Sequence, residues 1–235
     1  FLFGESAPST FDSLDGDHVY FLASDIAAFK TDESNLDDQL DAGDLSFAYN
    51  VFDIFKQRVR DRAEYVSGLL DAGIDADKDE TYKWRRKDEP WAKDKAEWDE
   101  LWRKRTKNEY VRRIVAKELG RKPKTAQEPG GKEQQTNEAD QVVAPAPPSP
   151  ADAIRKQNKQ FITVQEDADP SWVLEKYLSA FAHAYDPHSD YMSAGAMEDF
   201  DIDMKLSLVG IGAVLNSDED GSAKVVRLIE GGPAY

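Results

Sequence analysis

A long stripe of apolar residues between positions 44 and 73 limits what this chain can fold into more than any other feature of its sequence. Its members recur every three or four residues, which places them on one face of an α-helix. They are Phe47, Val51, Phe52, Phe55, Val59, Val66 and Leu70. Gly73 follows as a helix stop. Such a helix must bury its stripe against other elements, so the sequence predicts a mainly α fold.

Two further segments show helical spacing. Residues 11–30 place large apolar side chains at helical intervals, with Ser24 as the expected N-cap of a second short helix. Residues 172–185 form a stretch that Asp169 and Pro170 open and Pro187 closes, because proline disfavours helical geometry in the residue before it. We therefore expect short helices before the central one and a buried helix near position 180.

Three tryptophans mark the helix expected over residues 90–119. Trp91, Trp98 and Trp102 lie at offsets of seven and eleven, which places them on nearly the same helical face. Such a stripe can stack on a ligand, but a tryptophan stripe at helical spacing is more often core, because the large apolar area of the indole stabilises most when it is buried. We predict that it belongs to the core.

The charge of the chain is uneven. The whole sequence has 30 Lys+Arg and 46 Asp+Glu, a formal net charge of −16, which disfavours nucleic acid and anionic membranes as general partners. Residues 83–124 nevertheless carry sixteen basic against eight acidic residues, whereas residues 1–80 carry six against nineteen. A basic patch for an acidic partner is one interpretation. We favour the other, in which the two regions face each other or present solvated faces.

Residues 120–160 are expected to be a flexible insertion. The stretch "GRKPKTAQEPGGKEQQTNEADQVVAPAPPSP" is rich in Gly, Pro, Gln and Ala and has almost no large apolar residues to offset the entropy of ordering. The predicted organisation is a helical N-terminal domain at 1–119, this insertion, a helical segment and junction at 161–203, and the start of a β-rich domain at 204–235. From position 204 "MKLSLVGIGAVL" and "AKVVRLI" flank "NSDEDGS", a pattern typical of a β-hairpin.

No metal or cofactor site is predicted. Asn216, Asp218, Asp220 and Gly221 match the start of a calcium loop, but its twelfth position, which must supply a carboxylate, is Arg227. The histidines His18, His183 and His188 lack ligand-like spacing, and the absence of cysteine removes thiolate zinc sites and disulfides. Nor does the sequence hold a G-x-S-x-G elbow, a P-loop or a dinucleotide fingerprint.

The stretch "LVGIGAVL" is the best candidate for a binding loop. Gly210 and Gly212 flank Ile211 and let successive backbone N–H groups point into a concavity that can hold a carboxylate. The strand that follows can accept an extended peptide along its edge. Glycines in a strand also mark bulges or close packing, so the spacing by itself leaves both interpretations open.

Several segments resemble the C-terminal processing peptidases, also called tail-specific proteases. "DPHSDYMSAGAMEDFDIDMKLSLVGIGAVL" and "VVRLIEGGPA" are similar to the junction between the N-terminal region and the PDZ domain of this family. Upstream, "LDGDHVYFLASDI", "GDLSFAYNVFDIFKQRV" and "PWAKDKAEWDELWRKR" resemble its helical N-terminal domain. The resemblance implies a helical domain followed by the first hairpin of a truncated PDZ-like domain, with Gly210, Ile211, Gly212 and Ala213 at the carboxylate-binding loop.

The resemblance also implies an activity. Members of this family are periplasmic serine endopeptidases that recognise the C-terminal tails of protein substrates and cleave with a serine activated by a lysine in a later domain. No position here matches that pair, so we predict no catalytic residue in this chain and no activity for it alone, and we expect it to be part of a larger protease. The segment would supply the helical platform and part of the tail-binding site.

The residues expected to bind a substrate C-terminus are Leu208, Gly210, Ile211, Gly212, Ala213 and Val214. An adaptor protein is a further partner that the resemblance allows. A membrane span is not expected, because no apolar run is long enough, and the opening residues lack a signal-peptide pattern, so the periplasmic location rests on the resemblance. The alternative function is a non-catalytic helical adaptor or peptide-binding module.

Overall fold

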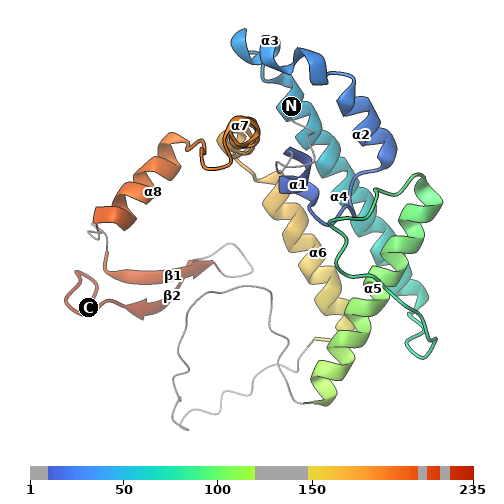
Figure 1. The fold of residues 1–235 in the computed structure, drawn as a ribbon. Coiled ribbons are helices and arrows are strands. Elements are labelled where there is room, and N and C mark those ends of the chain that lie inside the picture. Colours follow the sequence, from blue (N-terminus) through green and yellow to red (C-terminus); the bar gives the residue numbers. More distant parts are fainter. Residues whose placement is uncertain (1–9, 120–147, 206–210, 218–222) are drawn as a thin grey trace. The chain divides into compact units, whose positions relative to one another are not determined.

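The computed structural model describes residues 10–119, 148–205, 211–217 and 223–235. The described part is mainly helical, with one two-stranded sheet, as the sequence predicts. Its residues divide into two compact units, 1–191 and 192–235 (Figure 1). The first unit is built on the helix predicted from the apolar stripe.

That helix, α4, spans Ser46–Ala72 and is the centre of the first unit. All seven residues of the predicted stripe are buried along it. Gly73 follows with a φ of 86°, a conformation that favours glycine and ends the helix where the sequence predicts. The remaining helices of this unit are α1 (Thr10–Asp15), α2 (Ala23–Lys30), the 3-10 turn η1 (Glu33–Asn35), α3 (Leu36–Asp41), α5 (Lys95–Glu118), α6 (Pro150–Glu166) and α7 (Pro170–Tyr185).

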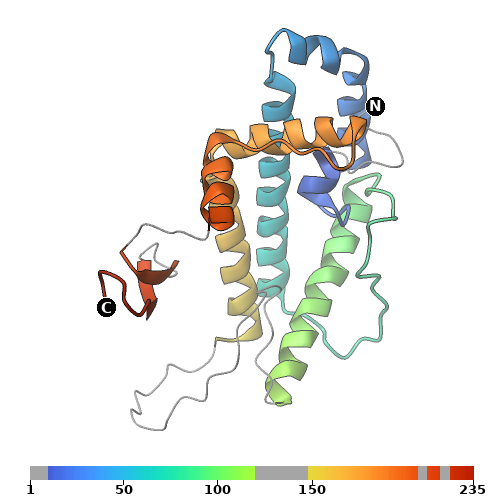
Figure 2. The same cartoon turned by 60° about the vertical axis from the view of Figure 1, so that its left-hand side comes forward.

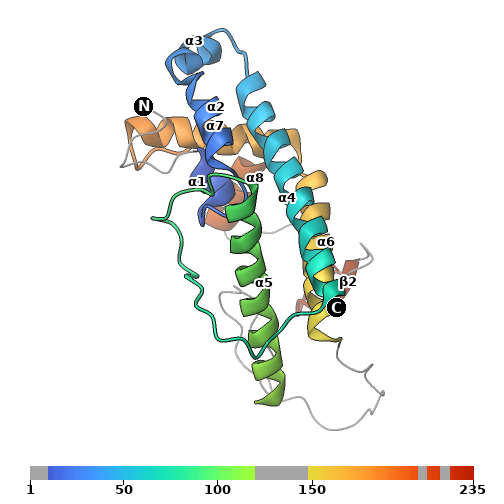
Figure 3. The ribbon, with the colours of Figure 1, turned by 90° about the vertical axis from the view of Figure 1, so that its right-hand side faces the viewer.

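Helices α5, α6 and α7 all pack against α4. Figures 2 and 3 show α5 and α6 running alongside α4, while α7 crosses it near its N-terminal end. Asp169 caps α7 by accepting a hydrogen bond from the Ser171 N–H at 2.7 Å, and Asp186 follows its last residue. The predicted opening and closing signals of this helix are therefore confirmed.

Two clusters of buried side chains share the length of α4. The cluster towards its N-terminal end is aromatic, with Phe21, Phe52 and Phe55 against Tyr177 of α7 in the same cluster. The cluster towards its C-terminal end joins the three helices α4, α5 and α6. Its members include Val66, Leu70, Trp98, Trp102 and Ile154.

Trp98 and Trp102 are core residues, as predicted. Both indole N–H groups donate to one backbone acceptor, the carbonyl of Val19, at 2.8 and 2.7 Å. Trp91 does not lie on the predicted helical face, because it precedes α5, which begins at Lys95. Asp94 is the N-cap of this helix and accepts a hydrogen bond from the Glu97 N–H. Trp91 instead stacks on His18 with ring centroids 3.7 Å apart.

A buried carboxylate, that of Asp15, organises the turn after α1. It accepts hydrogen bonds from the backbone N–H groups of Val19, Tyr20 and Phe21 at 2.8–3.0 Å and from the Trp91 indole at 3.1 Å. Burial raises the pKa of this carboxyl, although the four donors act in the opposite direction. One side chain thus fixes the chain between α1 and α2.

Three predicted boundaries need correction. Ser24 is not the N-cap of α2: Leu22, two residues earlier, occupies the cap position, and its N–H donates to the Asp25 carboxylate at 2.9 Å. The flexible insertion predicted for 120–160 is wrong over 150–160, which lie in α6; Ser149 caps this helix and Pro150 opens it. Residues 120–147 lie outside the described residues.

The junction after α7 also differs from the prediction. Helix α8 spans Ala194–Lys205, so residues 204 and 205 are helical and do not begin a strand. The strands are β1, Ala213–Ser217, and β2, Ala223–Leu228. The division into compact units groups α8 with this hairpin.

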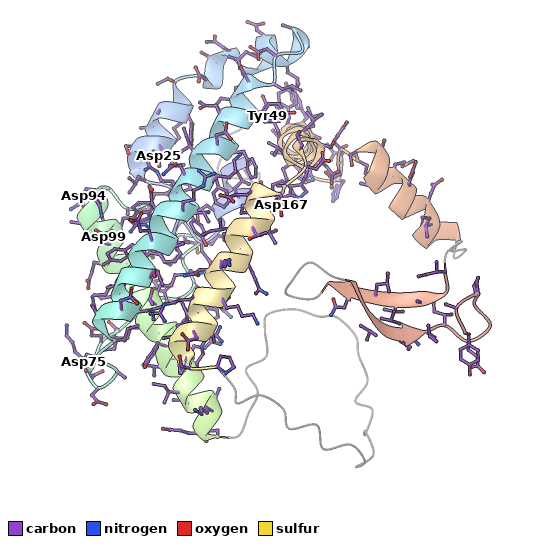
Figure 4. All side chains as sticks on the ribbon, turned by 180° about the vertical axis from the view of Figure 1, so that it is seen from behind. Asp25, Tyr49, Asp75, Asp94, Asp99 and Asp167 are labelled. Atoms are coloured by element: carbon purple, nitrogen blue, oxygen red, sulfur yellow. The ribbon has the colours of Figure 1, made fainter. Side chains whose placement is uncertain are left out.

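The oppositely charged regions meet in the first unit. Arg62 of α4 pairs with Asp99 of α5 at 2.6 Å and lies 3.3 Å from the centre of the Trp98 ring. Figure 4 labels Asp94 and Asp99 near the start of α5. Glu80, in the connection from α4 to α5, pairs with Arg103 at 2.7 Å and with Lys107 at 3.2 Å. The pairs of Glu80 with Arg103 and Lys107 support the interpretation that the acidic and basic regions face each other.

We expect Glu80→Gln to loosen this connection at neutral pH. Hydrogen bonds from Arg103, Lys78 and Lys107 hold the pKa of the Glu80 carboxyl well below its usual range. A depressed pKa in the folded state means that the ion pairs stabilise above the unfolded pKa and are lost as pH falls through the folded pKa. Hydrogen exchange of residues 76–82 should therefore be faster in the variant, and the difference should persist until pH falls below the usual glutamate range.

The matched control is Glu64→Gln, an exposed residue of α4 with the same change of charge. It should leave exchange of residues 76–82 unchanged. Equal exchange in Glu80→Gln and Glu64→Gln at neutral pH would contradict the assignment of Glu80 as the tether.

Candidate functional site

The predicted binding loop lies directly before the antiparallel hairpin. Ala213 pairs with Leu228 and Val214 with Arg227, but Leu215 pairs with Val225. One residue of β2 is therefore bulged out of the ladder, which bends the strand and increases its local twist. The structure confirms the β-hairpin predicted from the sequence.

The segment before β1 is held by the segment after β2. The Ile229 N–H donates to the carbonyl of Gly212 at 2.7 Å, and the Ala234 N–H donates to the carbonyl of Ile211 at 2.9 Å. Gly232 closes the intervening turn by donating to the Ile229 carbonyl at 2.9 Å. Both loop carbonyls are thus engaged by the residues "IEGGPA".

Two independent observations show that position 212 requires glycine. Its φ is 74°, a conformation that side chains disfavour. A Cβ atom placed on Gly212 would lie 2.8 Å from the Cα of Gly232, closer than atoms can pack. The two glycines are in backbone contact, so the packing interpretation of the loop glycines is true of Gly212.

The backbone N–H groups of the loop differ from its carbonyls in their hydrogen bonding. Among the residues that the structure describes, the N–H groups of Ile211 and Gly212 have no backbone acceptor. The Ile211 side chain is 59% exposed. The carbonyls of Ile211 and Gly212 thus accept hydrogen bonds within the hairpin segment, whereas their N–H groups can donate to an incoming acceptor. A carboxylate suits this role, because its charge strengthens the hydrogen bonds it accepts.

The other four predicted site residues fall into two groups. Ala213 and Val214 lie on β1, half-buried and exposed respectively. Leu208 and Gly210 lie outside the described residues, so the structure brings together four of the six. The calcium-loop match also lies in part outside them, and within the described part no group of three or more His, Asp or Glu residues could hold a metal ion.

The comparisons with known proteins decide the family. The family model described as the tail specific protease N-terminal domain matches residues 4–195. This chain belongs to the tail-specific protease family. A tail-specific protease of Haemophilus influenzae (strain ATCC 51907 / DSM 11121 / KW20 / Rd) is 30% identical over 223 residues, which cover 94% of this chain and 28% of the relative. The chain therefore spans about 28% of the length of that tail-specific protease.

The matched tail-specific protease domain ends close to the division between the compact units. The family model stops at residue 195 and the first unit at residue 191, so the helical unit corresponds to the family domain. The hairpin lies beyond that model. None of the described helices is apolar over a length that could cross a bilayer.

Sequence reasoning missed two features of this tail-specific protease chain. The first is the backbone contact of Gly212 with Gly232. The two adjacent glycines of "GGPA" indicate a close approach of the backbone to another segment, but their spacing does not show which segment that is. The second is a cleft between α5 and α6 in the helical unit. Its signal is the excess of basic residues in 83–124, which the sequence by itself favours as a solvated or paired face.

Proposed function

We propose that the whole protein is a periplasmic serine endopeptidase that trims or degrades proteins from their C-termini. In this proposal the present chain supplies the helical platform and part of a PDZ-like tail-binding site. Membership of the tail-specific protease family supports the reaction class. The observation that carries the binding role is the loop at 211–212, whose carbonyls are engaged while its N–H groups have no backbone acceptor among the described residues.

The proposed recognition uses charge and shape together. The terminal carboxylate of a substrate accepts hydrogen bonds from the N–H groups around Gly210, Ile211 and Gly212, and bonds to a charged acceptor are about twice as strong as neutral ones. The residues before the terminus extend along the edge of β1 and pair with its backbone. Their apolar side chains pack near Leu208 and Val214, of which Val214 is 38% exposed in the structure.

The chemistry itself is assigned to a serine and a lysine that no position in this chain matches. We therefore expect no peptide hydrolysis from the 235-residue chain by itself. Its contribution to the reaction is to select a substrate end and hold it. The hydrogen bonds to the carbonyls of Ile211 and Gly212 favour this role, because donors that are already in place cost less entropy when the tail binds.

We expect Gly212→Ala to weaken tail binding about tenfold or more in the whole protein. The added Cβ would meet the Gly232 backbone at 2.8 Å, and the φ of 74° disfavours a side chain, so the loop must shift and misplace its donors. A loss of about 1.4 kcal/mol, the size of one charge-assisted hydrogen bond, is a factor of ten in affinity. Calorimetry with a peptide of free C-terminus measures the change.

The control is Gly195→Ala in α8, where an added Cβ meets nothing within 4 Å. It should leave the affinity for the same peptide unchanged. If Gly212→Ala binds the peptide as tightly as Gly195→Ala does, the loop does not position a substrate end.

A further inference from the structure

The helical unit contains a cleft of about 520 Å³ between α5, α6 and the connection that precedes α5. Figure 3 shows this connection running beside α5. One face of α5 lines the cleft with Arg105, Asn108 and Arg112, at helical offsets of three and seven. Facing it, α6 contributes Asn158 and Phe161. The cleft therefore runs along two helices and does not form a closed cavity.

Two guanidinium groups in the cleft lack the acidic partners that neighbouring cations have. Arg103 and Lys107 of α5 pair with Glu80, and Arg113 pairs with Glu109 at 2.7 Å. Among the described residues neither Arg105 nor Arg112 has a carboxylate within 4.0 Å. Two carboxylates also line the cleft, Glu109, which pairs with Arg113, and the exposed Asp17. With Glu109 paired, the charges of Arg105 and Arg112 stand against that of Asp17, which leaves the cleft an excess of one positive charge in a chain that is acidic overall.

The remaining lining is aromatic. Tyr20 and Phe161 stack with ring centroids 5.7 Å apart at the base of the cleft. Burial raises the pKa of the Tyr20 hydroxyl to about 12. Like an ordinary tyrosine, it is protonated at neutral pH and can donate a hydrogen bond. Trp84, in the connection before α5, is 63% exposed and carries Arg85 over its ring at 4.5 Å. A large exposed aromatic beside two guanidinium groups is typical of a recognition surface.

The spacing of the two arginines fits an extended peptide. Seven residues of α-helix separate Arg105 from Arg112, a rise of about 10.5 Å. A polyproline II segment has three residues per turn and rises about 3.1 Å per residue, so side chains three residues apart lie on one side about 9 Å from each other. Two carboxylates at that spacing reach both guanidinium groups. The carboxamides of Asn108 and Asn158 each offer a donor and an acceptor to the peptide backbone between them.

We propose that this cleft binds an extended acidic segment of another protein, with carboxylates three residues apart. The aromatic side chains of the cleft pack against the proline rings and apolar groups of such a segment, as in other grooves that bind polyproline II helices. The proposal revises the interpretation of the basic region, because Arg105 and Arg112 have no carboxylate partner among the described residues. It does not depend on the loop at 211–212, which lies in the other compact unit.

The probe is a fluorescein-labelled peptide of repeating Glu-Pro-Pro, acetylated and amidated so that it has no terminal carboxylate. Its binding to the full chain is followed by fluorescence anisotropy at near-physiological salt. We expect it to bind more tightly than a peptide of the same composition with contiguous glutamates, and a Gln-Pro-Pro repeat should not bind. Equal affinity for the spaced and contiguous peptides, or no binding of the spaced one, overturns the proposal.

Two double variants distinguish binding in the cleft from general electrostatic attraction of the peptide to the protein surface. Arg105→Gln with Arg112→Gln should weaken binding of the Glu-Pro-Pro peptide about tenfold or more, because it removes two charge-assisted contacts. Lys117→Gln with Lys159→Gln removes the same charge from exposed positions outside the cleft and should change affinity by less than about twofold. Equal losses in the two variants would overturn the proposal.

Two further measurements complete the test. Trp84→Phe keeps an aromatic ring and should retain most of the binding, whereas Trp84→Ala should lose it; thermal melts of every variant confirm that the helical unit remains folded. A single-stranded oligonucleotide of equal charge should bind more weakly than the peptide. If it binds as tightly, the cleft is a general anion site and the peptide assignment is wrong.

Discussion

Replacing Asp15 by Asn should lower the free energy of unfolding of the helical unit by about 2–4 kcal/mol, because each buried donor left without an acceptor costs roughly 1–3 kcal/mol. The Asp15 carboxylate accepts from three backbone N–H groups and from the Trp91 indole, and it is 2% exposed. An asparagine keeps one carbonyl oxygen and turns an NH₂ group towards the remaining donors. Desolvation of the charged carboxylate outweighs its four hydrogen bonds in setting the pKa, which is why we do not expect the full sum.

Denaturant unfolding followed by far-ultraviolet circular dichroism measures this loss. The control is Trp91→Phe, which removes one of the four donors and leaves the carboxylate in place. It should cost about 1–2 kcal/mol, from the lost hydrogen bond and the smaller ring. If Asp15→Asn is no less stable than Trp91→Phe, the carboxylate does not organise the turn between α1 and α2.

Replacing Tyr177 by Ala should destabilise the same unit by about 3–5 kcal/mol, the usual cost of removing a large buried side chain. Tyr177 is 1% exposed and, together with Val173, brings α7 into the cluster on α4, with its ring 6.1 Å from that of Phe47. Its hydroxyl is buried and has no hydrogen-bond partner in the described part of the chain. The ring, and not the hydroxyl, is therefore the stabilising group.

The matched variant Tyr177→Phe tests that distinction. It keeps the ring and removes a buried polar group without a partner, so stability should stay the same or rise by up to about 1 kcal/mol. Both variants are compared by denaturant unfolding and by hydrogen exchange in α7. A loss in Tyr177→Phe close to that in Tyr177→Ala would mean that the hydroxyl is hydrogen-bonded and that the packing account of α7 is wrong.

The sequence could predict those parts of the fold that depend on local patterns. The stripe of α4 repeats every three or four residues, and Gly73, Asp169 and Pro187 act on the helix ends beside them. Helix α6 was missed in its first turns because the signal at Ser149 and Pro150 lies inside a Pro-rich stretch that resembles a linker in composition. Composition averages over a window and cannot locate a single cap.

Contacts between distant residues could not be predicted in the same way. Asp15 lies 76 residues before Trp91, and Gly212 meets Gly232 across the hairpin, so neither pair has a spacing that identifies the partner. The candidate loop at 211–214 was located from its glycines and from the family resemblance, whereas the cleft along α5 needed the structure. Only the three-dimensional arrangement shows which arginines already have a carboxylate and which do not.

The central claim is that the loop at 211–212 presents backbone donors to the terminal carboxylate of a substrate. The most direct test compares two peptides of one apolar sequence, one with a free C-terminus and one with a C-terminal amide, by calorimetry against the whole protein. The amide loses the anion and its charge-assisted hydrogen bonds, so we expect it to bind about tenfold more weakly or worse. Equal affinities for the acid and the amide would contradict the claim and leave Gly212 as a packing glycine.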